Sequence, residues 1–179
     1  EALLPKKFRA DIYYLASLLD EDADNHKAAI KSSRLAGSIY RTIRSRPSEA
    51  RALLSTGIAY HSLGDLPRAI EYLAKSLHLS RRLELRHLQA FTSVQLAKSY
   101  AAYGGEGKAR VLLHEAMEIA RDGDYKSILF SSYLQLYKLA DKGGDGLGKS
   151  SITRSLRKLV MKIPVENPEV VEFRALEGQ

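Results

Sequence analysis

The sequence predicts an all-α protein built from repeated helical hairpins, and three observations carry this prediction. Between small groups of glycine and proline, the chain is rich in Ala, Leu, Arg, Lys and Glu, the residues that lose least on entering a helix. Apolar residues recur at intervals of three and four rather than two, as along Ala69, Ile70, Leu73 and Leu77. The chain also resembles itself at a fixed offset, the one that separates Tyr60 from Tyr100.

Composition narrows the class of protein further. A hydrophobic fraction of 45% in 179 residues is enough for a sizeable core, and the absence of cysteine excludes disulfide frameworks, thiolate nucleophiles and iron–sulfur clusters. No apolar run approaches the roughly 18 to 20 residues that a bilayer crossing needs. We therefore expect a cytoplasmic protein without a transmembrane segment. The net charge of +7 favours anionic partners such as nucleic acid or acidic proteins.

Two stretches, residues 48–82 and 88–122, align without gaps at this offset. The aligned pairs are Gly57 with Ala97, Tyr60 with Tyr100, Gly64 with Gly104, Ala69 with Ala109, Leu73 with Leu113 and Ser76 with Ala116. Small residues let two helices approach closely, the tyrosines fill the space beside them, and the glycines make the turn. This pattern resembles the tetratricopeptide repeat (TPR), a helix–turn–helix unit.

The resemblance implies a right-handed α-α superhelix of about four hairpins over residues 1–163. We place the units at 6–45, 48–82, 88–122 and 126–163. In the last unit, Tyr137 takes the tyrosine place, Leu134 replaces the small residue, and the turn is expanded. The first unit is degenerate, with Ala16, Leu19, Ala28 and Leu35 in corresponding places. Residues 164–179, with two prolines and four glutamates, are predicted to form an extended arm or linker. An alternative is that the run EVVEF at 169–173 folds back on the repeats and competes for the chain's own groove.

In this family the first helices of the units line a concave surface that binds a protein or peptide. The resemblance therefore implies partner-binding residues on those helices, and an alternative is that they form an ordinary solvated helix face. The polar residues would form hydrogen bonds with the backbone of an extended peptide or a helix, and the lysines would pair with its acidic groups. The predicted residues are Leu54, Ile58, His61, Phe91, Val94, Gln95, Lys98, Ser131, Gln135 and Lys138.

Units of this length resemble bacterial regulatory arrays, including peptide-sensing receptors of the Rap and PlcR type, which suggests a regulatory or signalling role. A nucleic-acid-binding solenoid is the rival, because basic residues gather on the last predicted outer helix. Self-association through a terminal repeat is also open, with Leu156, Leu159 and Val160 as candidates. The basic residues are Arg154, Arg157, Lys158 and Lys162.

No residue set indicates an enzyme. The run GGDGLGKS at 143–150 formally matches a phosphate-binding loop, but that loop must follow a β-strand, and here the preceding residues have helical spacing. The five histidines never fall at the i, i+4 interval of a helical metal pair. We therefore expect no catalytic residue, no metal and no cofactor, and a mechanism of binding rather than turnover.

Overall fold

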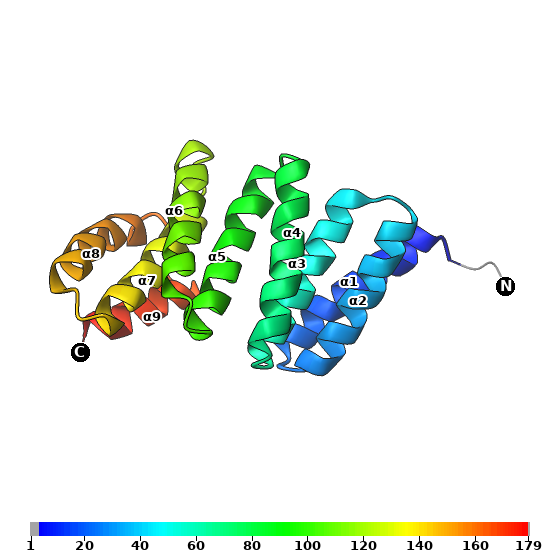
Figure 1. The fold of residues 1–179 in the computed structure, drawn as a ribbon, viewed down its shortest axis with the longest axis horizontal. Helices are drawn as coiled ribbons and strands as arrows, with labels where there is room; N and C mark the ends of the chain where they lie inside the picture. Colours follow the sequence, from blue (N-terminus) through cyan, green and yellow to red (C-terminus); the bar gives the residue numbers. More distant parts are fainter. Residues whose placement is uncertain (1–3, 179) are drawn as a thin grey trace.

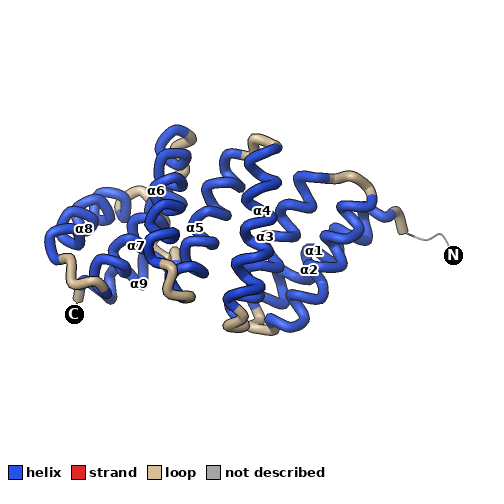
Figure 2. Tube along the Cα trace, viewed as in Figure 1, coloured by secondary structure: helices blue, strands red, loops and turns tan. Residues whose placement is uncertain are grey.

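The computed structural model describes residues 4–178, and within that range every regular element is a helix (Figures 1 and 2). The helices pair into four hairpins, α1 to α8, which follow one another along the long axis, and α9 returns beside α7. Their bounds are α1 Lys6–Asp22, α2 His26–Thr42, α3 Arg46–Ser62, α4 Leu66–Arg82, α5 Arg86–Ala102, α6 Glu106–Asp122, α7 Lys126–Lys142, α8 Gly146–Val160 and α9 Pro168–Glu177.

One turn geometry connects all eight helices of the hairpins. Helices α1 to α7 each have 17 residues, and three residues separate each helix from the next. The following helix starts after a backbone N–H reaches five residues back, as from Asp65 to the Tyr60 carbonyl at 2.9 Å. The middle residue of each turn is left-handed, and these are Asp24, Arg44, Gly64, Glu84, Gly104, Asp124 and Gly144.

This regular spacing corrects the expected register of the two outer units. The turn before α8 is no longer than the others, so Tyr137 stands one full repeat after Ala97, in the small-residue place. Tyr137 was expected in the tyrosine place, which Ala140 holds instead. That expectation was wrong because it matched residue type, whereas the constant turn length sets the register.

The first unit needs a shift of one residue. Ser17, Ala29 and Ala36 are fully buried at the positions equivalent to Gly57, Ala69 and Ser76. Ala16, Ala28 and Leu35 were expected at these three places, and Leu19 at the place equivalent to Tyr60. All four lie one place earlier and are not buried; Leu19 is 70% exposed.

Residues 164–179 contain a helix, so the expectation of an extended arm was wrong for most of them. Position 164 is where the next left-handed turn residue is due, and a proline stands there. The proline ring holds φ negative, so the turn cannot repeat. Helix α8 ends at Val160, residues 161–167 form a longer connection, and α9 starts at Pro168 outside the regular spacing.

Gly57 tests how closely α3 and α4 approach each other. A Cβ built on Gly57 would lie 2.6 Å from Leu73 Cγ and 3.1 Å from Leu73 N, a backbone atom that cannot move aside. We expect Gly57→Ala to lower the free energy of unfolding by about 1–3 kcal/mol, as overpacking does. Urea denaturation gives the value.

Gly37→Ala is the matched control, because Gly37 also lies inside a helix and its added Cβ would meet only Ala52 Cβ at an ordinary 3.5 Å. There the better helix propensity of alanine should raise stability by up to about 1 kcal/mol. Equal effects of the two substitutions would contradict the close approach of α3 to α4.

Candidate groove on the concave wall

The first helices of the hairpins approach one another and form one wall of the solenoid, the predicted concave wall. Two of these helices repeat the same polar pair. Gln95 and Lys98 on α5 have their counterparts in Gln135 and Lys138 on α7, one repeat later. All four side chains are half-buried. The wall therefore presents an amide and an ammonium group at each of two consecutive helices.

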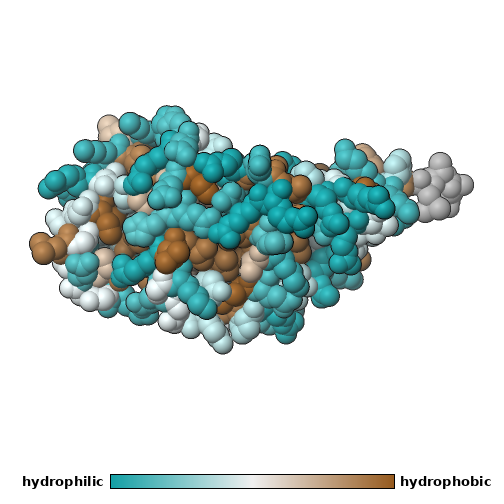
Figure 3. Space-filling model, turned by 45° about the horizontal axis from the view of Figure 1, so that its top comes forward, coloured by the Kyte–Doolittle hydropathy of each residue, from teal (hydrophilic) through white to brown (hydrophobic). Residues whose placement is uncertain are grey.

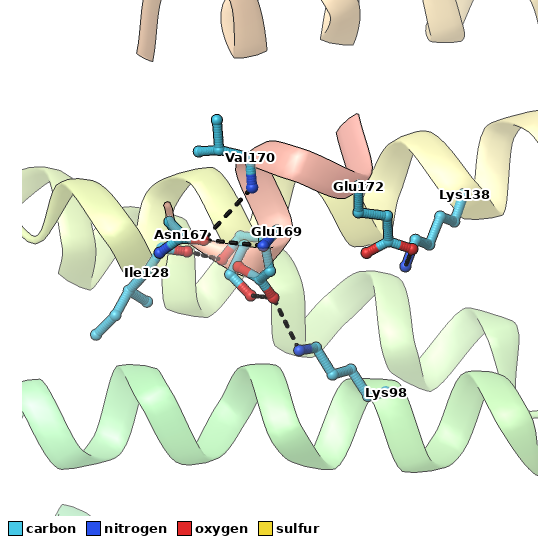
Figure 4. Close-up of polar contacts among 9 residues, drawn as sticks. Lys98, Ile128, Lys138, Asn167, Glu169, Val170 and Glu172 are labelled. Carbon is cyan, nitrogen blue, oxygen red and sulfur yellow. Dashed lines mark hydrogen bonds and ion pairs between the residues drawn. The ribbon is translucent and has the colours of Figure 1, made fainter. Parts of the chain in front are cut away.

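Helix α9 lies against this part of the wall (Figure 4). Lys98 Nζ and Ser131 Oγ both donate to Glu169 Oε1, at 2.9 and 2.8 Å. Lys138 Nζ pairs with Glu172 Oε1 at 2.5 Å. Glu169 thus joins α5 to α7, and three predicted groove residues meet carboxylates of the same short helix.

Apolar contacts accompany these ion pairs. Phe173 is 1% exposed and packs edge-on against Phe130 at 6.0 Å and Tyr137 at 6.3 Å between ring centroids. Val170 is fully buried in the same cluster, together with Leu156 of α8. Leu156 therefore cannot serve the predicted dimer contact, because α9 helps to cover it.

Farther along the wall, polar side chains link α1, α3 and α5. Ser62 Oγ donates to Glu21 Oε1 at 2.6 Å, and His61 Nδ1 lies 3.0 Å from Ser99 Oγ. Ser99 Oγ also donates to the Gln95 carbonyl at 3.1 Å. Burial lowers the pKa of His61, the nearby Lys98 cation lowers it further, and the Glu21 carboxylate partly opposes them.

The other predicted groove residues belong mainly to the core. Leu54 and Val94 are buried, and Ile58 and Phe91 are partly buried against neighbouring apolar side chains. Among the described residues, the side-chain amides of Gln95 and Gln135 form no hydrogen bond; the bond from Ser99 reaches the backbone carbonyl of Gln95. Among the predicted groove residues, Gln95 and Gln135 therefore keep unengaged polar side chains, whereas Lys98 and Lys138 are paired with carboxylates of α9.

The sequence offered the fold-back of residues 169–173 only as an alternative, and it assigned them no partners on the wall. The residues concerned are Glu169, Val170, Glu172 and Phe173. A signal for them exists in the sequence: the proline at 164 falls where the turn requires a left-handed residue. The spacing of the seven turns must be known before Pro164 can be recognised as the end of the regular array.

Other candidate sites have simpler explanations. The run at 143–150 is the turn after helix α7 and the start of α8, where Asp145 Oδ1 accepts from Gly148 N at 2.9 Å. A carboxylate thus already occupies the place that a phosphate would take, and Lys149 pairs with Asp141. Among the described residues, no three His, Asp or Glu side chains gather around a possible metal position.

Two further surfaces are apolar. Exposed Phe8, Ile12, Leu15 and Leu19 lie along α1 at the N-terminal end. A groove of about 440 Å³ runs between α4 and α6 and includes Leu77, Val111 and Leu112. Apolar side chains also gather in the middle of the face shown in Figure 3, between polar surfaces. No helix in the described part of the chain is long and apolar enough to cross a membrane.

Solved structures resemble this chain closely in fold. RapI in its apo form superposes with a TM-score of 0.83 at 18% identity, over 90% of this chain and 59% of RapI. This chain therefore spans about three-fifths of the length of RapI. BtubC from P. vanneervenii gives a TM-score of 0.79 at 17% identity, over 94% of this chain and 70% of BtubC.

A third structure carries the family name of the repeat. It is a P. anserina protein, named as a kinesin light chain with nearly identical TPR-like repeats, with a TM-score of 0.75 at 16% identity. The match covers 96% of this chain and 84% of that one. The chain has a TPR-like fold. The predicted all-α solenoid of four hairpins is thereby confirmed, although no protein-family model and no curated protein matches the sequence.

The lowered pKa of His61 gives the TPR-like array a pH dependence. The unfolded chain takes up a proton near the ordinary histidine pKa of 6.5, whereas the folded chain resists it. Stability should therefore be complete above pH 6.5 and decline as the pH falls below it. Urea unfolding of His61→Gln between pH 7.5 and about 5 should show a smaller decline than the wild type.

His78→Gln is the control, because His78 is exposed on α4. It should keep the pH dependence of the wild type. If the two variants behave alike, His61 is not the group that titrates.

Proposed function

We propose that this chain is a protein-interaction module whose concave wall binds a segment of another protein, as part of a regulatory or signalling system. The single observation that carries the proposal is the pair Gln95 and Lys98, repeated as Gln135 and Lys138 on consecutive wall helices. Hydrogen-bond donors repeated at the hairpin spacing suit a peptide or helix that runs across the helices.

The packing behind the wall supports binding rather than chemistry. The wall helices are fixed by a buried core that includes Leu73, Leu113 and Leu134, so the groove is preformed and loses little entropy when it is filled. The long units resemble bacterial regulatory arrays, which supports the regulatory part of the proposal.

A nucleic acid is the second candidate partner, and one observation favours it. The outer surface of α8 has a shallow hollow of about 620 Å³ lined by Lys149, Arg154, Arg157 and Lys158. Phosphate contacts there would make affinity fall steeply and linearly with the logarithm of salt concentration. Arg157 and Lys149 already pair with Glu177 and Asp141, which reduces the free charge.

Photo-crosslinking tests the proposed groove. A photoreactive phenylalanine analogue at Gln95 or Gln135 should capture a bound protein in a native lysate, and the same analogue at exposed Glu118 on outer helix α6 should not. Replacing Lys98 and Lys138 by alanine should weaken binding of that protein about tenfold or more, since each charged hydrogen bond contributes about 1 kcal/mol or more.

Lys75→Ala with Lys158→Ala is the matched control, because both lysines lie on outer helices. It should leave the affinity unchanged. Capture that is as strong from Glu118, or binding that depends on the outer lysines and on salt, would contradict the groove and favour the nucleic-acid surface.

A further inference from the structure

Helix α9 occupies the groove although it does not belong to the regular array. Pro164 ends the repeating turn, and the connection of residues 161–167 is long, with Met161 84% and Val165 51% exposed. In the array, the wall helices pack mainly against outer helices, and consecutive wall helices also approach each other. Helix α9 packs mainly on α7 but also reaches α5 through Lys98, two wall helices back. It therefore lies across the groove and does not extend the stack.

Helix α9 carries its own N-terminal cap. Asn167 Oδ1 accepts from Glu169 N at 2.9 Å, and Pro168 follows at the first helical position. Glu169 adds a negative charge to the first turn, where the helix dipole favours it.

The charges of α9 match the wall at two points. Glu169 and Glu172 are three residues apart, so their carboxylates lie on one side of the helix. Lys98 and Lys138, their partners, come from consecutive wall helices. The spacing of one lysine per hairpin thus matches the spacing of one carboxylate per turn along a helix that lies across the wall.

The apolar residues of α9 alternate with these charges. Val170 and Phe173 directly follow the two glutamates and enter the cluster of Phe130, Leu134 and Tyr137. Tyr137 can contribute because it stands where Gly57 and Ala97 stand in the earlier hairpins. The site therefore fits a segment in which a glutamate is followed by an apolar residue and, after one further residue, a second glutamate is followed by an aromatic residue.

We propose that this site is the receptor for an acidic amphipathic helix of a partner protein, and that α9 is a built-in competitor that fills it until the partner displaces it. This deepens, and rests on, the proposed groove function. Val170 and Phe173, both buried, and the two partly exposed ion pairs hold α9 on the wall, and the short tether of residues 161–167 adds a high local concentration. A partner helix with the same pattern competes for the same contacts.

The test uses the full chain and a fluorescent synthetic peptide of residues 164–178 as the probe. Wild-type protein should bind the peptide weakly, because α9 fills the site. Glu169→Lys with Glu172→Lys repels α9 from the two lysines, and this variant should bind the unmodified peptide at least about tenfold more tightly. Glu166→Lys with Glu118→Lys, which changes net charge equally at exposed positions, should bind as weakly as the wild type.

A charge swap identifies the contacts. Adding Lys98→Glu and Lys138→Glu to the repelled variant should abolish binding of the unmodified peptide, because the carboxylates then face each other. In a protein whose α9 is unchanged, Lys98→Glu with Lys138→Glu should repel α9. This variant should then bind a peptide in which lysine replaces Glu169 and Glu172. If the affinity of neither peptide depends on the charges at positions 98 and 138, the assignment of this site is wrong.

A nicked protein guards against loss of folding in the variants. With a protease site inserted between Val165 and Glu166, which are both exposed, cleavage leaves the array intact and α9 held only by its contacts. The labelled peptide should then exchange with α9 on the nicked protein. Absence of both exchange and binding to the repelled variant would overturn the proposal. So would a dimer that trades α9 between two copies, because the occupant would then be a second copy.

These outcomes are separate from those of the groove proposal. A protein that crosslinks at Gln95 and Gln135 but does not compete with the peptide leaves the groove function standing and removes α9 as its competitor. A peptide that binds and follows the charges, with no protein captured at the groove, supports the receptor site alone.

Discussion

The three-residue turn with a left-handed middle residue is the constraint on which the rest of the structure depends. It recurs from Asp24 to Gly144 at a constant interval, both within and between the hairpins. Because each turn fixes the angle and offset between consecutive helices, every wall helix meets the next in the same way. A polar pair on one wall helix therefore reappears at a fixed distance on the next, as Gln95 and Lys98 do in Gln135 and Lys138.

Four of these turns use Asp24, Arg44, Glu84 and Asp124 in place of glycine. A side chain in the left-handed region costs free energy, and the packing of seventeen-residue helices on both sides offsets that cost. Proline is the one residue that the turn cannot accommodate, since its ring excludes positive φ. A single Pro164 therefore ends the array and directs the next helix to another surface.

The candidate site arises where the repeat departs from its own pattern. Tyr137 replaces the small residue of the earlier hairpins and provides an aromatic surface for Phe173. Lys98 and Lys138 follow the pattern and provide cations at the hairpin spacing. The apolar cluster around Tyr137 lies next to the regularly spaced lysines, so the C-terminal end of the groove differs from the rest of it. Regular TPR-like repeats alone would not produce this difference.

The sequence by itself determined the helical class and the offset between the repeats, because small residues, turn glycines and helical spacing are local signals. It misplaced the outer units by one and three residues, since residue type is a weaker guide than turn length where the pattern is degenerate. Only the tertiary structure decided that Leu54 and Val94 face the core and that Glu169 and Glu172 meet Lys98 and Lys138. Those contacts join residues far apart in the chain, and the path of α9 after Pro164 depends on the surface that all four hairpins build together.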